Sequence, residues 1–199
     1  MGLIDRAKNI IVQPKAEWSV IDTEPATVGG LYTGYVIPLS LLSVICATLG
    51  MVLFGISVPF LGNIRYPLGT ALGSAAVRFV AGLISIYVIA LVIDALAPTF
   101  GGTKNSIQAF KVAAYSYTAA WVFGVLAIIP ALAIIAGLLG LYSLYLLYTG
   151  LPALMKSPPE KALGYTALVI VVAIVLFICI GFLVSALGLG IPAGLPRTM

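Results

Sequence analysis

The sequence contains no histidine and very little charge. Only 8% of its 199 residues are Asp, Glu, Lys or Arg, whereas a soluble domain carries about 25%. Without histidine the chain lacks the usual general base and the most common zinc ligand. So few charges do not cover a globular surface with polar groups, and most of the surface must therefore face lipid.

The remaining reactive groups are scattered. Cys46 and Cys179 fall inside apolar runs, where thiols usually act as inert packing groups. The glycines form no phosphate-binding loop, and the ten basic residues form no stripe for a nucleic acid. None of the six carboxylates forms an obvious pair within the membrane: Asp5, Glu17, Asp22, Glu24, Asp94 and Glu160. We therefore expect no enzyme, and no catalytic, cofactor-binding or metal site.

Long apolar runs take the place of charge. Hydrophobic residues make up 62% of the chain, and the mean hydropathy is +1.18. About 20 apolar residues span a bilayer as a helix, and such runs occupy residues 31–57, 75–97, 108–129, 131–152 and 164–188. Pro130 alone separates the third run from the fourth and predicts a tight hairpin at 129–131. The sequence thus predicts an all-α, polytopic membrane helix bundle of about five transmembrane helices.

The basic residues predict the orientation, because short cytoplasmic loops carry an excess of lysine and arginine. With a cytoplasmic N-terminus, three basic residues lie outside, namely Arg65, Arg78 and Arg197. The other seven lie inside: Arg6, Lys8, Lys15, Lys104, Lys111, Lys156 and Lys161. We therefore expect a multi-pass protein of the cell (inner) membrane, with its C-terminus outside. A cleavable signal peptide is not expected, because a long mixed-charge stretch precedes the first apolar run.

Three regions follow: an amphipathic cytoplasmic segment at 1–30, a five-helix domain at 31–190 and a short outer tail at 191–199. Residues 2–13 predict a helix that ends before Pro14, with Arg6 on its polar face. Trp18 favours the headgroup layer. Two interpretations stay open: an interfacial helix on the inner leaflet, or a helix packed against the cytoplasmic end of the bundle. Its apolar arc of roughly 120° contains Leu3, Ile4, Ala7, Ile10 and Ile11.

Three stretches carry a resemblance to a known family. They are QPKAEWSVIDTEPATVGGLYTGYVIPL (13–39), FGGTKNSIQAFKVAAYSYTAAWV (100–122) and LYSLYLLYTGLPALMKSPPEKALGYT (141–166). The first stretch has a Pro and a Trp before the first span. The second has a Lys-bearing loop that leads to Tyr-Ser-Tyr in the third span. The third has a tyrosine-rich fourth span that ends in a Lys-Pro-rich loop. The chain resembles the bacterial branch of the Yip1-domain family, whose members have five spans.

The resemblance implies an integral membrane protein with no established activity. Eukaryotic Yip1 relatives bind Rab-type GTPases and carry an Asp-Leu-Tyr-Gly-Pro motif in a long cytoplasmic N-terminal region. That motif does not occur in this sequence, so the resemblance does not extend GTPase binding to this chain. We expect action through contacts with membrane lipids or other membrane proteins. The alternative is a small transporter or channel, which would need an aqueous cavity lined by polar groups.

A basic, aromatic patch is the candidate contact site. Antiparallel third and fourth spans would place Tyr115 and Tyr145 at matching depth, facing each other, because each lies 15 residues from Pro130. An aromatic belt at the headgroup level is the simpler interpretation, and a groove for an anionic lipid or an acidic partner segment is the functional one. The candidate residues are Lys111, Tyr115, Tyr142, Tyr145, Tyr148, Lys156 and Lys161.

Two charges fall within or near the second span. Arg78 is buried deep in the bilayer if this span begins near Leu68, or reaches the outer rim if it begins near Ala75. Asp94, near the inner end, either pairs with Lys104 or Lys111 at the interface or forms an ion or proton site at the mouth of a cavity. Small residues four apart are expected to pack helices together; these pairs are Gly69 with Gly73, Ala133 with Gly137, and Gly181 with Ser185.

Overall fold

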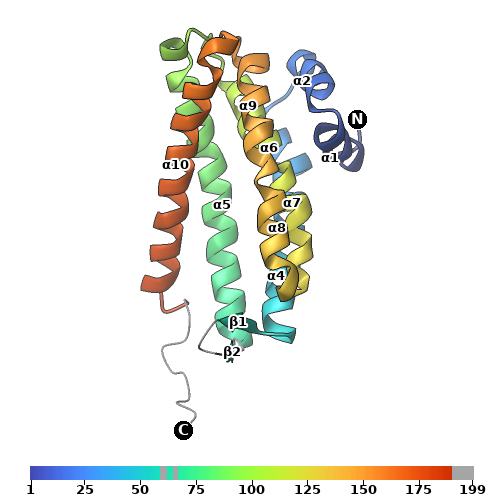
Figure 1. The fold of residues 1–199 in the computed structure, drawn as a ribbon, viewed down its shortest axis with the longest axis vertical. Coiled ribbons are helices and arrows are strands. Elements are labelled where there is room, and N and C mark those ends of the chain that lie inside the picture. Colours follow the sequence, from blue (N-terminus) through green and yellow to red (C-terminus); the bar gives the residue numbers. More distant parts are fainter. Residues whose placement is uncertain (59–61, 65–66, 190–199) are drawn as a thin grey trace.

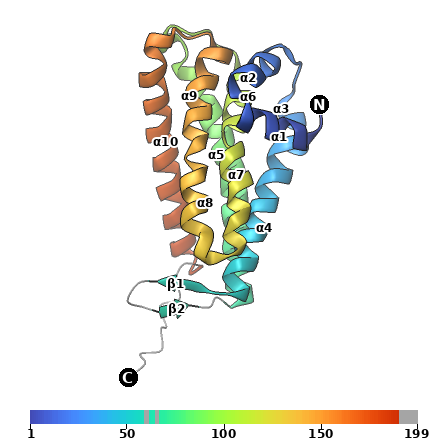
Figure 2. The same cartoon turned by 45° about the vertical axis from the view of Figure 1, so that its right-hand side comes forward.

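A computed structural model describes residues 1–58, 62–64 and 67–189. Five long apolar helices run antiparallel to one another in sequence order, and two short helices lie against the side of the bundle near one end (Figures 1 and 2). The predicted all-helical bundle with five candidate membrane spans is confirmed. We call the two short helices, α1 and α2, the cap, the end of the bundle near them the capped end, and the opposite end the hairpin end.

The helices at the capped end come first in the chain. They are α1 (Leu3–Val12) and α2 (Pro14–Thr23). Gln13, with φ −134° and ψ 60°, ends α1, and Pro14 begins α2 at the first helical position, where a missing N–H costs nothing. The predicted boundary at Pro14 is therefore present, but a second helix follows it directly.

The five spans contain several local irregularities. The first joins α3 (Val28–Leu31), a π-helical turn (Tyr32–Val36) and α4 (Ile37–Leu53). The second is α5 (Leu68–Leu96), followed by a 3₁₀ turn (Pro98–Phe100). The third joins α6 (Ser106–Ser116), α7 (Thr118–Gly124) and a 3₁₀ turn (Val125–Ile128). A 3₁₀ turn (Pro130–Leu132), α8 (Ala133–Gly140) and α9 (Tyr142–Met155) form the fourth, and α10 (Pro159–Ala186) is the fifth.

The turn between the third and fourth spans lies at Pro130, as the sequence predicts. Ile129 is extended, with φ −106° and ψ 105°, and separates the two 3₁₀ turns. This turn packs against the first span at Gly50, where a Cβ would lie 2.4 Å from the carbonyl oxygen of Ala127. Only glycine permits that approach of helix α4 to the turn.

The hairpin end holds a feature that the apolar runs did not predict. Strands β1 (Ile56–Val58) and β2 (Gly62–Ile64) form an antiparallel pair with Ile56 opposite Ile64. The predicted first span included residues up to 57, but α4 ends at Leu53 because Gly55 follows with φ 74°. Arg65 and Arg197 lie outside the described residues.

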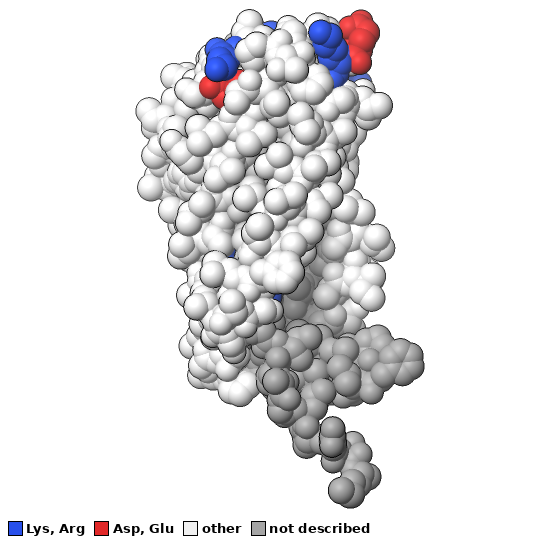
Figure 3. Space-filling model, turned by 90° about the vertical axis from the view of Figure 1, so that its left-hand side faces the viewer, with Lys and Arg blue, Asp and Glu red and all other residues white. Residues whose placement is uncertain are grey.

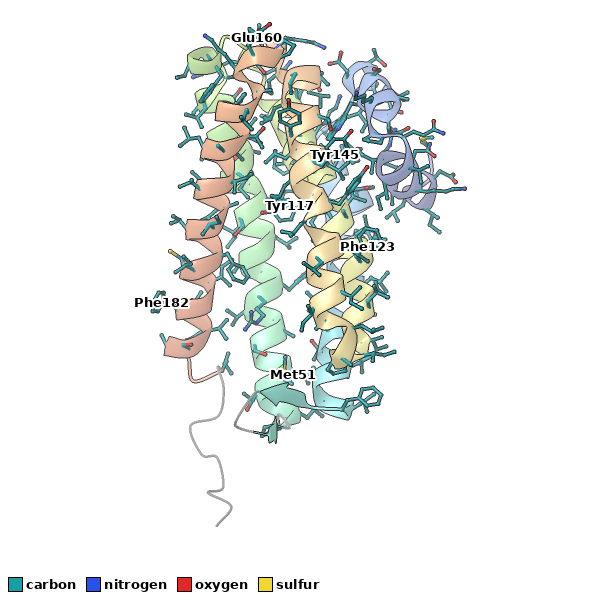
Figure 4. The ribbon with its side chains drawn as sticks, viewed as in Figure 1. Met51, Tyr117, Phe123, Tyr145, Glu160 and Phe182 are labelled. Carbon is teal, nitrogen blue, oxygen red and sulfur yellow. The ribbon has the colours of Figure 1, made fainter. Side chains whose placement is uncertain are left out.

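The core is concentrated towards the capped end. Its largest fully buried side chains include Trp18, Tyr165, Ile93, Leu146 and Met155. The wall of the bundle elsewhere presents large apolar side chains outward, such as Phe182 on α10 (Figure 4). Charged side chains gather at the capped end, above a long uncharged wall (Figure 3). This distribution fits a protein that crosses a bilayer.

The small-residue pairs do not pack helices together as predicted. A Cβ added at Gly69, Gly137 or Gly181 would meet nothing within 4 Å, and at Gly73 it would meet only the side chain of Leu189. Close helix contacts form at other glycines, including Gly50 and Gly150. Spacing alone predicts which residues share a face, but it does not predict which neighbour that face meets.

Candidate functional site

Helix α2 is fastened to α9 by its tryptophan. Trp18 is 1% exposed, and its Nε1 donates a hydrogen bond of 3.1 Å to Oγ1 of Thr149. The indole lies against Gly150, where a Cβ would come within 2.6 Å of the ring. Trp18 therefore packs inside the protein and does not present its ring to lipid on the outer surface. A tryptophan with a glycine opposite it forms a close, specific contact between α2 and the fourth span.

Arg6 links α1 to α2. Its guanidinium donates to Glu17, at 2.5 Å, and to Glu24, and it lies 5.7 Å from the centre of the Tyr115 ring. The residue is 4% exposed, although the helical pattern placed it on the polar face. Burial lowers the pKa of Arg6, but the hydrogen bond and charge of Glu24 outweigh this, so the pKa is raised above its ordinary value. A buried arginine with two carboxylates forms a charge-balanced contact.

Lys111 and Gln108 hold the C-terminal end of α2. The Lys111 Nζ donates to the carbonyl oxygens of Ile21 at 2.7 Å and Glu24 at 2.6 Å. The Gln108 Nε2 donates to the carbonyl oxygen of Asp22 at 2.9 Å and to its Oδ1 at 3.1 Å. The last carbonyls of a helix have no partner inside the helix, and a cation there also favours the helix dipole. The third span thus supplies the hydrogen-bond donors that the C-terminal end of α2 lacks in its own sequence.

The fourth span likewise supplies a hydrogen-bond donor to the C-terminal end of α1. The hydroxyl of Tyr142 donates to the carbonyl oxygen of Ile11 at 3.0 Å, in the last turn of that helix. Lys156 follows α9 with a left-handed φ of 56°, and its Nζ lies 2.6 Å from Oδ2 of Asp22. This ion pair is partly exposed, and such pairs contribute about 0–1 kcal/mol. Both short helices are therefore held by side chains of the spans.

The seven candidate patch residues do not form one surface. Lys111 is 3% exposed and Tyr115 is 8% exposed, because α1 and α2 cover them. Tyr145 and Tyr148 are exposed, as are Lys156 and Lys161 (Figure 4 labels Tyr145 at the level of α1 and α2). The expected face-to-face placement of Tyr115 and Tyr145 is wrong. Tyr115 contacts Trp18, Tyr35 and Arg6, and Tyr145 contacts Tyr142.

The N-terminal segment itself occupies the groove that the sequence assigned to an acidic partner. Glu17, Asp22 and Glu24 all lie in this segment, and all three contact cations or capping groups. Ala7 and Ile10 are buried, which corresponds to the interpretation of residues 2–13 as a helix packed on the bundle. Ile4 is 78% exposed and Val12 is 64% exposed, so the helix also has an apolar outward side.

The outward side of α1 and α2 combines apolar and basic residues. On α1, Ile4 and Val12 flank Lys8, and on α2, Val20 and Lys15 are exposed. This surface is opposite the face that carries Arg6 and Ile10. We call it the outer cap face, defined by Ile4, Lys8, Val12, Lys15 and Val20. Large apolar side chains beside lysines are typical of a surface that lies at a lipid headgroup layer.

Two adjoining polar hollows open beside the cap, with volumes of about 350 and 440 Å³. Arg6 lines one and Lys111 the other, while Glu24, Gly30 and Tyr115 line both. The charges there are already paired or hydrogen-bonded within the chain. In the part of the chain that the structure describes, no group of three or more Cys, Asp or Glu residues could hold a metal ion.

The two charges of the second span lie far apart. Helix α5 begins at Leu68 and contains Arg78 in its first half, and both interpretations of the depth of Arg78 in the membrane stay open. Among the described residues, no ion pair joins Asp94 to Lys104 or Lys111, so the expected interfacial pair does not form. Lys111 bonds instead to the end of α2. The Oδ1 of Asp94 is buried and has no hydrogen-bond partner in the described part of the chain.

Sequence reasoning missed several residues that build the cap. No motif marks Arg6, Glu17, Gln108 or Thr149 individually, whereas Gly150 falls in the Tyr-Leu-x-Tyr-x-Gly-Leu pattern of the fourth span. Their partners lie far away in the sequence; Trp18 and Thr149, for example, are 131 residues apart. One signal was present, because Glu17, Trp18 and Gln108 fall within the stretches that resemble the Yip1-domain family.

The comparisons with known proteins identify one family. The model described as "Yip1 domain" matches residues 8–180, which include most of the cap and nearly all of the five spans. The comparisons with curated proteins and with solved structures gave no match.

Proposed function

This chain belongs to the Yip1 domain family, whose members are generally non-enzymatic membrane proteins, and from that premise we propose that it acts through its outer cap face. In this proposal the capped end lies on the cytoplasmic side of the cell (inner) membrane. The outer cap face then binds the anionic headgroup layer of the inner leaflet. We also propose that the chain is a member of the bacterial branch, for which the three stretches quoted above are the support.

One observation carries the proposal. The cap helices are fixed to the spans by one face, through Trp18, Lys111 and Tyr142, and they present Ile4 and Val12 outward although both are apolar. Exposed large apolar side chains on a short helix mark a contact surface. The neighbouring Lys8 and Lys15 would each contribute about 1 kcal/mol at an anionic leaflet.

The distribution of basic residues supports the orientation. All seven basic residues assigned to the cytoplasmic side lie at or near the capped end. Five lie on the cap or on connections, and the other two lie in helices, Lys111 in α6 and Lys161 in the first turn of α10. Arg78 lies in α5, towards the hairpin end. An excess of basic residues on one side is typical of the cytoplasmic side.

The transport alternative receives less support. The cavity between the spans contains Arg78 and Tyr117, but apolar side chains form most of its lining. Transport of a polar solute needs converging polar groups near the middle of the membrane. We therefore favour the contact function.

Site-directed spin labelling tests the contact function. A nitroxide is placed at position 4, 12 or 103 in a Cys46→Ala, Cys179→Ala background, and the protein is reconstituted in nanodiscs that contain phosphatidylglycerol. Position 103 is the control, because Thr103 is exposed on the connection before α6. We expect labels at 4 and 12 to be more accessible to oxygen than to a nickel chelate, and the label at 103 to show the reverse.

Two results would contradict the proposal. Equal nickel accessibility at all three positions would place the outer cap face in water. Shielding of positions 4 and 12 in native membranes but not in the nanodiscs would indicate a partner protein instead of lipid.

A further inference from the structure

A cavity of about 240 Å³ lies at mid-bundle, between α4, α5, α7 and α10. Its lining includes Phe79, Leu83, Trp121, Leu176 and Phe177, and Arg78 is the only charged residue among the described residues that line it. Figure 4 shows Tyr117, which also lines the cavity, at the middle level of the bundle. Among the described residues, the lining of the cavity therefore combines one cationic side chain with mostly apolar side chains.

Arg78 lies well inside the second span. It is the eleventh of the 29 residues of α5, about 15 Å from the first residue of that helix. The whole helix is about 43 Å long, whereas the hydrocarbon core of a bilayer is about 30 Å thick. A helix centred on that core places Arg78 below the headgroup layer of the leaflet at the hairpin end.

The described part of the chain offers Arg78 no counter-ion. Its side chain is exposed and takes part in none of the ion pairs or side-chain hydrogen bonds found there. Asp94 is 16 residues further along the same helix, about 24 Å away. The other carboxylate side chains belong to the cap segment and to Glu160 at the capped end (Figure 3 shows the acidic residues in view there). A charge in hydrocarbon is costly without a partner.

We propose that the cavity binds one anionic phospholipid, with the lipid phosphate on the Arg78 guanidinium and one acyl chain between α5 and α10. The guanidinium matches phosphate in charge and geometry and donates two parallel hydrogen bonds to it. The apolar lining suits an acyl chain and not a polar solute. This site lies apart from the outer cap face and does not depend on the function proposed for it.

The size of the cavity favours a membrane lipid over a free small molecule. Pockets that enclose a drug-sized ligand measure roughly 300–1,000 Å³, and this cavity is smaller. It therefore accommodates part of a ligand whose remainder stays in the bilayer. A carboxylate amphiphile such as a fatty acid shares the anionic head and apolar chain, so the experiment includes it as a competitor.

Trp121 provides a direct readout because it lines the cavity, whereas Trp18 is buried in the cap. Lipids with brominated acyl chains quench tryptophan fluorescence on contact. Both lipids carry a phosphate, but the choline ammonium of phosphatidylcholine offsets its charge, whereas phosphatidylglycerol keeps a net negative charge. In nanodiscs we expect brominated phosphatidylglycerol to half-quench Trp121 at a mole fraction about fivefold lower than brominated phosphatidylcholine, which corresponds to about 1 kcal/mol. Arg78→Gln should abolish this preference, and Arg78→Lys should retain part of it, because an ammonium keeps the charge but not the paired hydrogen bonds.

Lys161→Gln is the matched control, because Lys161 is an exposed cation at the capped end. This variant should keep the full preference of the unmodified protein. Equal quenching by the two lipids in the unmodified protein overturns the proposal, as does a preference that survives Arg78→Gln. Stronger quenching by brominated fatty acid than by phosphatidylglycerol also overturns it. If Arg78→Gln does not fold, the proposal is still tested by comparing the two lipids in the unmodified protein and in Arg78→Lys.

Discussion

Single buried charges determine how the cap is held. Lys111 and Arg6 are both almost fully buried, and each bonds to groups of the N-terminal segment that would otherwise lack partners. The sequence identified Lys111 as important but assigned it to an exposed patch, and it placed Arg6 on a solvated face. Both errors have one physical cause. Helical periodicity describes a single helix, whereas the partners of these charges come from other elements.

Replacing Lys111 with methionine should release the cap. The change removes two charge-assisted hydrogen bonds and leaves the carbonyls of Ile21 and Glu24 without donors, at a cost of about 2–3 kcal/mol. Limited proteolysis should then cut the segment before Val28 faster than in the unmodified protein. Lys104→Met, at an exposed position, serves as the control and should not change the rate. Equal rates for both variants would mean that Lys111 does not hold α2.

The Arg6 and Glu17 contact should behave as a coupled pair. Arg6→Met alone leaves the Glu17 carboxylate buried without its partner, which is expected to cost about 3–5 kcal/mol. Arg6→Met combined with Glu17→Leu should recover much of that loss, since replacing both charges by apolar groups is often neutral. Thermal unfolding of the four proteins in one detergent gives the coupling. Strictly additive effects would contradict a direct contact.

Whole elements were easier to predict than their contacts. The five spans follow from apolar runs long enough to cross a bilayer, and Pro130 marked the turn between the third and the fourth. The strands β1 and β2 were missed because β1 begins inside the first apolar run and each strand has only three residues. Small residues spaced four apart were expected at helix contacts, yet Gly137 meets nothing, while Gly150, in no such pair, touches Trp18. The spacing of residues along a helix shows which side chains share a face, but it does not show which element packs against that face.

Two glycine substitutions should therefore have opposite effects. Gly150→Ala places a Cβ 2.6 Å from the indole of Trp18, and the resulting displacement of α2 should cost about 1–3 kcal/mol. Gly137→Ala meets open space within α8 and should be neutral or stabilising by up to about 1 kcal/mol. Thermal unfolding measures both, and the emission maximum of Trp18 should move to longer wavelength in Gly150→Ala alone. A red shift in neither variant would contradict the packing of Trp18 on α9.

At the scale of the whole molecule, the five-span fold and the concentration of charge at one end follow from composition and pattern. The cap does not, because its contacts join residues up to 134 positions apart, as between Asp22 and Lys156.

Reporter fusions test the topology of the whole molecule. Fusions after Lys104 and Lys161 should report the cytoplasm. A fusion after Asn63, in the connection at the hairpin end, should report the outside. The reverse pattern would contradict the proposed orientation.

Hydrogen exchange of residues 3–23 in nanodiscs tests the central claim most directly. Because Lys111, Tyr142 and Trp18 fix the cap to the spans, we predict that these amides are protected even in neutral lipid. Anionic lipid should slow their exchange about thirtyfold further, since Lys8 and Lys15 each contribute about 1 kcal/mol at such a surface. Lys8→Gln with Lys15→Gln should remove only this additional protection. Rapid exchange in both lipids, or equal exchange in both with the unmodified protein, would contradict the account.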